Sequence, residues 1–291
     1  MSSFQGIWVP IVTPFINQAI DFVGLRRLVG HLLESGVDGI VVCGTTGEAA
    51  ALGKHEQLAV LDAVLERVPP QQVVMGLAGN NLTELLQFQS EILKRHLAGL
   101  LVPAPYYIRP SQAGLEAFFK TVADASSVPV ILYDIPYRTG VSFEQATLLN
   151  IVAHENIVAI KDCGGNLNNT LALLASGQVD VLCGEDNQIF NALCLGATGV
   201  IAASAHVHPE LFVQLYRQLR EQQLTAARTT FFRLTPLIQA LFVEPNPGPV
   251  KAALALQGLI RDELRAPMQA SGESTTRRLR EILAALRHSS R

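Results

Sequence analysis

The chain has 291 residues, 49% of them apolar, and a formal net charge of −3. This length suits an α/β barrel with an added helical segment, and the apolar fraction is ample for one large core. Basic residues are spread along the chain, which argues against binding to nucleic acid or to a membrane surface. No apolar run is as long as a membrane span, and the N-terminus lacks a signal-peptide pattern. We therefore expect a cytoplasmic protein.

Short β-branched apolar runs alternate with amphipathic helical stretches along the chain. The amphipathic stretches include residues 22–35, 54–68, 82–96 and 112–126, and the apolar runs are residues 6–15, 39–43, 73–78, 99–103, 128–135, 157–161, 179–183 and 199–203. Such alternation predicts parallel strands joined by helices. Eight such units predict an α/β fold, a (β/α)8 TIM barrel, over residues 1–223. Residues 224–291 read as a C-terminal helical extension.

Local signals fix where several of these helices begin and end. Asp21, Ser111 and Ser142 stand where N-caps are expected, and Gly36 and Gly177 where helices should stop. A doubly wound open sheet is the competing architecture. It usually carries a glycine-rich loop after its first strand, which residues 10–14 do not provide.

Lys161 is the one lysine of five that ends an apolar run, that of residues 157–161. Burial at a strand end disfavours the charged ammonium. A neutral lysine can attack a carbonyl carbon to form a Schiff base. A lysine paired with a nearby carboxylate is the plain alternative. Lys251, which opens a helix after a proline-rich turn, looks ordinary.

Barrel enzymes build their sites at the C-terminal ends of the strands. In this sequence those ends carry polar residues that suit Schiff-base chemistry, namely Thr45, Thr46, Tyr107, Tyr133, Arg138 and Lys161, and Gly184 follows the seventh strand. A tyrosine could carry protons to and from the reacting atoms if hydroxyl partners hold it. An arginine could bind a carboxylate through two hydrogen bonds. Glu185 and Asp186, which follow Gly184, are expected to cap the next helix.

Five segments together resemble the dihydrodipicolinate synthase family. They are Gly-Thr-Thr-Gly-Glu at residues 44–48, Pro-Tyr-Tyr at 105–107, Tyr-Asp-Ile-Pro-Tyr-Arg-Thr-Gly at 133–140, Ile-Lys-Asp at 160–162 and Phe-Val-Glu-Pro-Asn-Pro at 242–247. The resemblance runs essentially end to end. It implies condensation of pyruvate with aspartate 4-semialdehyde, on the route to lysine and diaminopimelate. A paralogue acting on another aldehyde or 2-oxo acid, like N-acetylneuraminate lyase or 4-hydroxy-2-oxoglutarate aldolase, is the alternative.

The resemblance also implies a role for each site residue. Lys161 would form a covalent imine with pyruvate without any cofactor or metal, and Tyr133 would transfer protons with Thr45 and Tyr107. The tyrosine at position 107 would reach the neighbouring subunit's site, which implies a homodimer or a homotetramer. The remaining residues would bind substrate: Thr46 and the Ile201 backbone for pyruvate, Arg138 for the carboxylate of the aldehyde, and Gly184 in the pocket wall.

Several residues depart from the family pattern. Asp134 replaces a usual asparagine, Tyr137 a small serine, and Cys163 a small residue on the same side of its strand as Lys161. The lysine-inhibited members carry two histidines and a glutamate at positions matching Lys54, Gln57 and Leu85. We therefore expect weak or absent inhibition by lysine, although Asn81 and Tyr106 are retained.

Other classes of protein fit the residues less well. A binding barrel without catalysis is disfavoured because the expected reactive residues are all present. A phosphate-binding barrel is disfavoured because acidic residues follow the seventh strand. His206 and His208 lack a third ligand, so no metal site is expected. The four cysteines (Cys43, Cys163, Cys183 and Cys194) show no paired spacing, and we expect buried free thiols.

Overall fold

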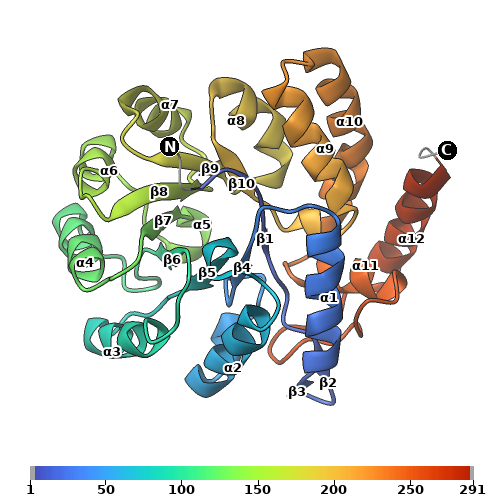
Figure 1. Ribbon diagram of the computed structural model, residues 1–291, viewed down its shortest axis with the longest axis horizontal. Coiled ribbons are helices and arrows are strands. Elements are labelled where there is room, and N and C mark those ends of the chain that lie inside the picture. Colours follow the sequence, from blue (N-terminus) through green and yellow to red (C-terminus); the bar gives the residue numbers. More distant parts are fainter. Residues whose placement is uncertain (1–3, 289–291) are drawn as a thin grey trace.

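The structure is a computed structural model that describes residues 4–288. Eight parallel strands form a closed barrel inside a ring of helices (Figure 1), so the predicted (β/α)8 fold is confirmed. β1 pairs with both β4 and β10, which closes the sheet. The barrel strands are β1 (Gly6–Pro10), β4 (Gly39–Val42), β5 (Val73–Gly76), β6 (Gly99–Pro103), β7 (Val130–Asp134), β8 (Ile157–Asp162), β9 (Asp180–Cys183) and β10 (Gly199–Ile201).

One helix of the outer ring follows each barrel strand. These are α1 (Phe22–Glu34), α2 (Lys54–Leu65), α3 (Leu82–Ile92), α4 (Gln112–Asp124), α6 (Gln145–Val152), α7 (Leu167–Ser176), α8 (Ile189–Leu195) and α9 (Pro209–Arg220). Short α5 (Pro136–Thr139) lies between β7 and α6. Single-turn 3₁₀ helices span Ala49–Ala51, Pro70–Gln72, Asp186–Gln188 and Ser204–His206. Within residues 4–288, no helix has the length and apolar character needed to cross a bilayer.

The C-terminal extension is helical, as expected. It contains α10 (Leu224–Leu241), α11 (Gly248–Leu256) and α12 (Glu273–His288). α10 packs against α9, and α12 packs against α10 and α11 at the outer edge of the molecule (Figure 1). α11 also contacts the 3₁₀ turn that follows β10. The extension therefore rests against the last barrel unit. A domain boundary at residue 223 stays a prediction.

Most of the predicted helix ends are confirmed. The side chains of Asp21 and Ser111 each accept a backbone N–H at the start of α1 and α4. Gly36 and Gly177 end α1 and α7 with φ angles of +82° and +60°, which glycine adopts without steric cost. The prediction for Ser142 is wrong. α6 begins at Gln145, and Glu144 is its N-cap. The cap is shifted because the Gln112 side chain binds this backbone: it donates to the Ser142 carbonyl at 2.9 Å and accepts the Glu144 N–H.

The first predicted strand is shorter than expected. β1 ends at Pro10, and the apolar residues after it form a buried loop that leads to a hairpin of β2 (Phe15–Ile16) and β3 (Ala19–Ile20). In that loop the Val12 backbone N–H donates to His206 Nε2 at 3.0 Å and not to a neighbouring strand. The buried His206 side chain thus provides the hydrogen-bond partner of the Val12 N–H, so this apolar segment is buried without forming a strand.

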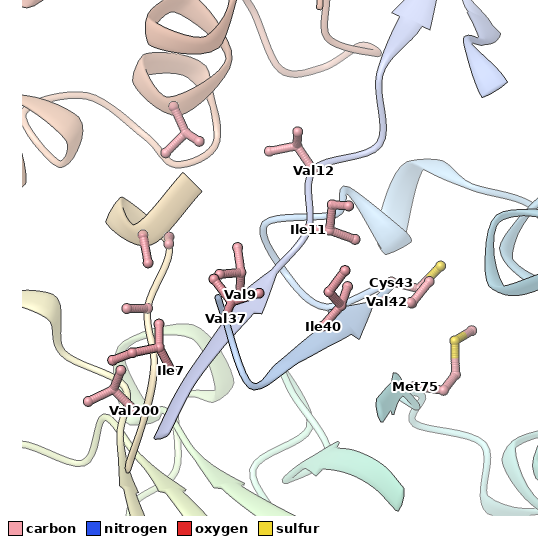
Figure 2. Packing of buried hydrophobic residues seen from close by; sticks show 14 of the residues in the cluster. Ile7, Val9, Ile11, Val12, Val37, Ile40, Val42, Cys43, Met75 and Val200 are labelled. Atoms are coloured by element: carbon pink, nitrogen blue, oxygen red, sulfur yellow. The ribbon is translucent and has the colours of Figure 1, made fainter. Parts of the chain in front are cut away.

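The strands bury side chains on both faces. One cluster fills the inside of the barrel and contains Phe4, Trp8, Val41, Val74, Leu101, Ile131, Tyr133, Ile135, Ala159, Cys163, Leu182 and Ile201. The larger cluster lies between the barrel and the helices, and Figure 2 shows part of it around β1 and β4. Burial on both faces accounts for the near-continuous apolar runs in the sequence.

The inner cluster yields a prediction for Gly39, which pairs with Trp8 across β1 and β4. A Cβ atom at Gly39 would lie 2.2 Å from the Trp8 ring. We expect Gly39→Ala to lower the free energy of unfolding by about 1–3 kcal/mol, the usual cost of overpacking a core. Trp8 is the only tryptophan, so urea unfolding followed by its fluorescence measures the change directly.

Gly30→Ala is the matched control, because nothing lies within 4 Å of a Cβ at this position in α1. It should leave stability unchanged or raise it by up to about 1 kcal/mol. Equal stability of the Gly39 variant and the wild type would contradict the packing described here.

Candidate active site

A cavity of about 370 Å³ opens at the C-terminal ends of the strands. It contains every predicted site residue except Tyr107. Residues at the ends of the last strands and the segment between α10 and α11 of the C-terminal extension complete its wall. The lining residues are Thr45, Thr46, Tyr133, Tyr137, Arg138, Lys161, Gly184, Asp186, Ile201, Ala203, Phe242, Val243, Glu244, Pro245 and Asn246.

Lys161 is 6% exposed and lies on the inner face of β8, directly opposite Tyr133 of β7. Its Nζ atom stands 4.3 Å from the centre of the Tyr133 ring. No ion pair involves Lys161 among the described residues, so the alternative of a lysine paired with a carboxylate is not supported. The amine is held against a phenol at the bottom of a cavity, within reach of a small carbonyl compound.

Gly184 gives the lysine side chain its space. A Cβ atom here would lie 2.3 Å from Cys163 Sγ and 2.8 Å from Lys161 Cε. Any larger residue would therefore displace both side chains. Cys163 belongs to the cluster inside the barrel, which confirms that it points to the same side as Lys161. Burial raises the pKa of the Cys163 thiol well above its usual value, so the thiol is uncharged at neutral pH.

Tyr133 is buried, and its phenol is uncharged. Burial raises the pKa of Tyr133 well above 10, while a hydrogen bond with the Thr45 side chain lowers it. The Tyr133 hydroxyl therefore keeps its proton at neutral pH and can give it to a reacting oxygen. Thr46 beside it is also buried, and its hydroxyl accepts a hydrogen bond from Asn246 Nδ2 at 2.9 Å. Two predicted residues, Thr45 and Thr46, thus face the lysine from the turn after β4.

Arg138 lies on α5 at the rim of the cavity, next to Tyr137. Its guanidinium carbon stands 5.6 Å from the centre of the Tyr137 ring. Burial raises the pKa of Tyr137 to about 12, and a hydrogen bond with Arg138 opposes that rise. Tyr137 therefore contacts Arg138 through both its ring and its hydroxyl.

Tyr107 is the one predicted residue that the structure leaves out of the cavity. It follows β6 with a φ angle of +71° and is 88% exposed. Tyr106 and Ile108 on either side of it are exposed as well. Within one chain, Tyr107 contacts neither Thr45 nor Tyr133 in the described hydrogen bonds.

Three other expectations need correction. Neither Glu185 nor Asp186 caps the following helix, because the Asp186 carboxylate instead accepts the Ser204 backbone N–H at 2.6 Å, and Glu185 makes no cap bond. Lys251 is not ordinary: it is fully buried and paired with Glu48. Cys194, in α8, is an exposed thiol, although the other three cysteines are buried.

The three positions predicted to weaken inhibition by lysine make contacts within the fold. Gln57 Nε2 donates to two backbone carbonyls, each at 3.1 Å, and Leu85 is buried in the outer core. Lys54 Nζ donates to the Glu84 carbonyl at 3.3 Å. The expectation of weak lysine inhibition stays a prediction.

His206 is a structural residue. It is fully buried, accepts the Val12 N–H through Nε2, and makes a 2.8 Å hydrogen bond to the Ala203 carbonyl through Nδ1. Burial lowers the pKa of His206 to about 4, so the ring is neutral. Across residues 4–288, no group of three or more histidine, cysteine, aspartate or glutamate side chains is arranged to hold a metal ion.

Sequence reasoning missed the contribution of the C-terminal extension to the cavity. Residues 242–246 line one wall, and Asn246 contacts Thr46 directly. The segment was noted as a family motif, but no local pattern shows that it returns to a turn 200 residues earlier in the chain.

A lysine and a tyrosine converge at the mouth of this (β/α)8 barrel. Barrel enzymes have their active sites at this place, at the C-terminal ends of the strands, and the protein belongs to that class. A model of the dihydrodipicolinate synthetase family matches residues 3–286, and the chain belongs to this family. The 4-hydroxy-tetrahydrodipicolinate synthase of Pelobacter propionicus is 38% identical over 275 residues, which cover 94% of this chain and 95% of that protein.

Solved structures agree with this assignment. The dihydrodipicolinate synthase of Aquifex aeolicus superposes with a TM-score of 0.94 at 33% identity, and covers 98% of each chain. A chloride-inhibited dihydrodipicolinate synthase from Acinetobacter baumannii, complexed with pyruvate, has a TM-score of 0.91 at 32% identity. That match covers 96% of this chain and 98% of the other.

The buried carboxylate of Asp134 yields a prediction about pH. Asp134 pairs with Asp162 across β7 and β8, and burial followed by the charge of Asp162 raises its pKa to about 7. The folded chain therefore holds a proton between pH 4 and 7 that the unfolded chain has lost, so this group makes stability fall as pH rises through that window. We expect Asp134→Asn to stabilise the protein relative to wild type, increasingly from pH 4 to 7 and constantly above it.

Urea unfolding of both proteins at several pH values measures the difference. Asp62→Asn is the control of opposite sign, because the hydrogen bond from Arg95 lowers the pKa of Asp62. The wild type should be more stable than the Asp62→Asn variant, and this difference in the free energy of unfolding should shrink as pH falls. A stability difference for the Asp134 variant that is the same at pH 4.5 and pH 8 would contradict the raised pKa.

Proposed function

We propose that this chain is a 4-hydroxy-tetrahydrodipicolinate synthase that condenses pyruvate with L-aspartate 4-semialdehyde. The observation that carries the proposal is the position of Lys161, buried in the cavity with its Nζ atom over the Tyr133 ring. Membership of the family supports the same activity. The relative from Acinetobacter baumannii that was solved with pyruvate supports the first substrate.

The proposed chemistry needs no cofactor. The Lys161 amine attacks the ketone carbon of pyruvate, and the resulting carbinolamine takes a proton from Tyr133 on its oxygen and loses water to give an imine. The Tyr133 phenolate then takes a proton from the methyl carbon, which gives an enamine. Its methylene carbon forms the new carbon–carbon bond to the aldehyde carbon of the second substrate, whose oxygen takes up a proton. Thr45 would hold and reprotonate Tyr133.

The substrate carboxylates would be bound at two places. The turn with Thr46 offers a hydroxyl and backbone N–H groups to the pyruvate carboxylate, beside Ile201 and Gly184. Arg138 at the rim would bind the carboxylate of the semialdehyde with two parallel hydrogen bonds. Both sites precede Lys161 in the sequence, one on the turn after β4 and the other on α5 after β7.

We further propose that the active unit is a homodimer, alone or paired into a homotetramer. Tyr107 is exposed together with Tyr106 and Ile108, which is unusual for adjacent large apolar side chains unless another surface covers them. A second copy of the chain would receive Tyr107 into its proton relay. The proposed location is the cytoplasm, where the four free thiols stay reduced.

Borohydride trapping tests the lysine chemistry. With pyruvate and borohydride we expect a stable adduct of one pyruvate per chain on the peptide that contains Lys161, measured by intact mass and peptide mapping. Lys161→Arg keeps the charge but cannot form the imine and should give no adduct. A folded wild-type protein that remains unmodified, or an adduct on another lysine, would contradict the proposal.

Arg138 tests the second substrate. Loss of a charged hydrogen-bonding partner costs about 1.5–3 kcal/mol, so Arg138→Ala should lower kcat/KM for the semialdehyde about 10- to 150-fold. Pyruvate trapping should be unchanged. Arg138→Lys, which keeps the charge without the fork, should fall between the two. If Arg138→Ala retains wild-type kcat/KM for aspartate semialdehyde, this substrate assignment is wrong.

A further inference from the structure

A buried ion pair joins the C-terminal extension to the turn after β4. Lys251, in the first turn of α11, is fully buried, and its Nζ atom pairs with the carboxylate of Glu48. Glu48 is 5% exposed and ends the segment that carries Thr45 and Thr46. Neither Lys251 nor Glu48 lines the cavity. The pair therefore lies directly behind the candidate active site without touching it.

Both charges have further partners. Lys251 Nζ donates to the Glu263 carbonyl at 2.8 Å and stands 4.2 Å from the centre of the Phe15 ring. The second oxygen of Glu48 accepts the Arg265 backbone N–H at 3.1 Å. Buried ion pairs of this kind are often no more stabilising than apolar residues of the same volume. A gain in stability therefore does not explain why charged residues occupy these positions. A directional contact that fixes one geometry does explain it.

The turn is stiff enough to pass on a displacement of Glu48. Glu48 has a φ angle of +55°, and its backbone N–H donates to the Thr45 carbonyl at 3.1 Å, so the two residues belong to one tight turn. Between them, the Gly47 carbonyl accepts the Thr13 hydroxyl at 2.7 Å. A shift of the Glu48 carboxylate would move the hydroxyls of Thr45 and Thr46.

The extension holds the same turn at a second point. Asn246, one residue before the Pro247 that precedes α11, donates to the Thr46 hydroxyl at 2.9 Å. Asn246 and Lys251 are five residues apart, and they contact the turn at Thr46 and Glu48 respectively. Two contacts from one short segment set both the position and the orientation of the turn.

We propose that Lys251 is a positioning residue for pyruvate. Through its buried contact with Glu48, it fixes the turn whose Thr46 receives the pyruvate carboxylate and whose Thr45 holds Tyr133. The inference rests on the proposed function, because it assigns Lys251 a part in that reaction. The C-terminal extension then contributes to the active site in two ways: residues 242–246 line the cavity, and Lys251 holds the turn after β4 through Glu48.

The double variant Lys251→Met and Glu48→Gln tests this. It removes both charges together and keeps an oxygen for the Arg265 N–H, so its melting temperature should stay within a few degrees of wild type. We expect the KM for pyruvate to rise about tenfold and trapping by borohydride to need correspondingly more pyruvate. The KM for the semialdehyde should change less than twofold, which general loosening of the fold would not produce.

Arg95→Met is the matched control, because it removes an ion pair with Asp62 that joins α2 to the end of α3, remote from the turn. Its KM for pyruvate should equal that of the wild type. A folded double variant with wild-type kinetics would overturn the proposal. If this double variant does not fold, the double variant Lys251→Met and Glu48→Met decides, because apolar residues of similar volume can replace a buried ion pair at little cost in stability. An unchanged KM for pyruvate in that variant would also overturn the proposal.

The two failures are distinguishable in the same experiment. A wild-type protein that gives no pyruvate adduct removes the proposed function itself. If the wild type gives the adduct and the variants trap pyruvate equally well at low pyruvate concentration, only the proposed role of Lys251 is excluded.

Discussion

Closure of the parallel sheet is the constraint on which the remaining structure depends. The seam between β1 and β10 is made where Gly6 meets Gly199, and a Cβ atom on Gly199 would lie 2.5 Å from the Gly6 carbonyl oxygen. Two glycines thus let the backbones approach closely enough to complete the ring of hydrogen bonds. Once the ring is closed, every strand ends at the same mouth. Residues far apart in sequence, such as Thr45 and Ile201, then share one cavity.

Within that ring, strand register decides which chemistry is possible. β7 and β8 pair so that Tyr133 lies opposite Lys161 and the next residues along, Asp134 and Asp162, lie opposite each other. Successive side chains on a strand point to opposite faces. The same pairing therefore places a phenol beside an amine inside the barrel and two carboxylates together outside it. Burial is the main reason that the pKa of Asp134 is raised, and the charge of Asp162, which this register brings opposite, raises it further.

The fold and most of the candidate site were predictable from sequence because both follow from local patterns. Apolar runs located the strands, and the residues after those runs located the mouth. Prediction failed where a distant contact replaced a local one. Gln112 displaced the cap expected at Ser142, and His206 satisfied backbone that looked like strand. Lys251 has the surroundings of any helix start, and only its distance to Glu48 distinguishes it.

The link between Glu48 and Lys251 also has a consequence for the order in which the protein is made. Glu48 leaves the ribosome about 200 residues before its partner, a delay of roughly 10–40 s at ordinary rates of about 5–20 residues per second. Six of the eight barrel strands, β5 to β10, are synthesised in that interval. During it, the turn after β4 carries a carboxylate with no counter-ion, and burying it would be unfavourable. Burial of this turn is therefore coupled to the arrival of α11, which brings the counter-ion for Glu48.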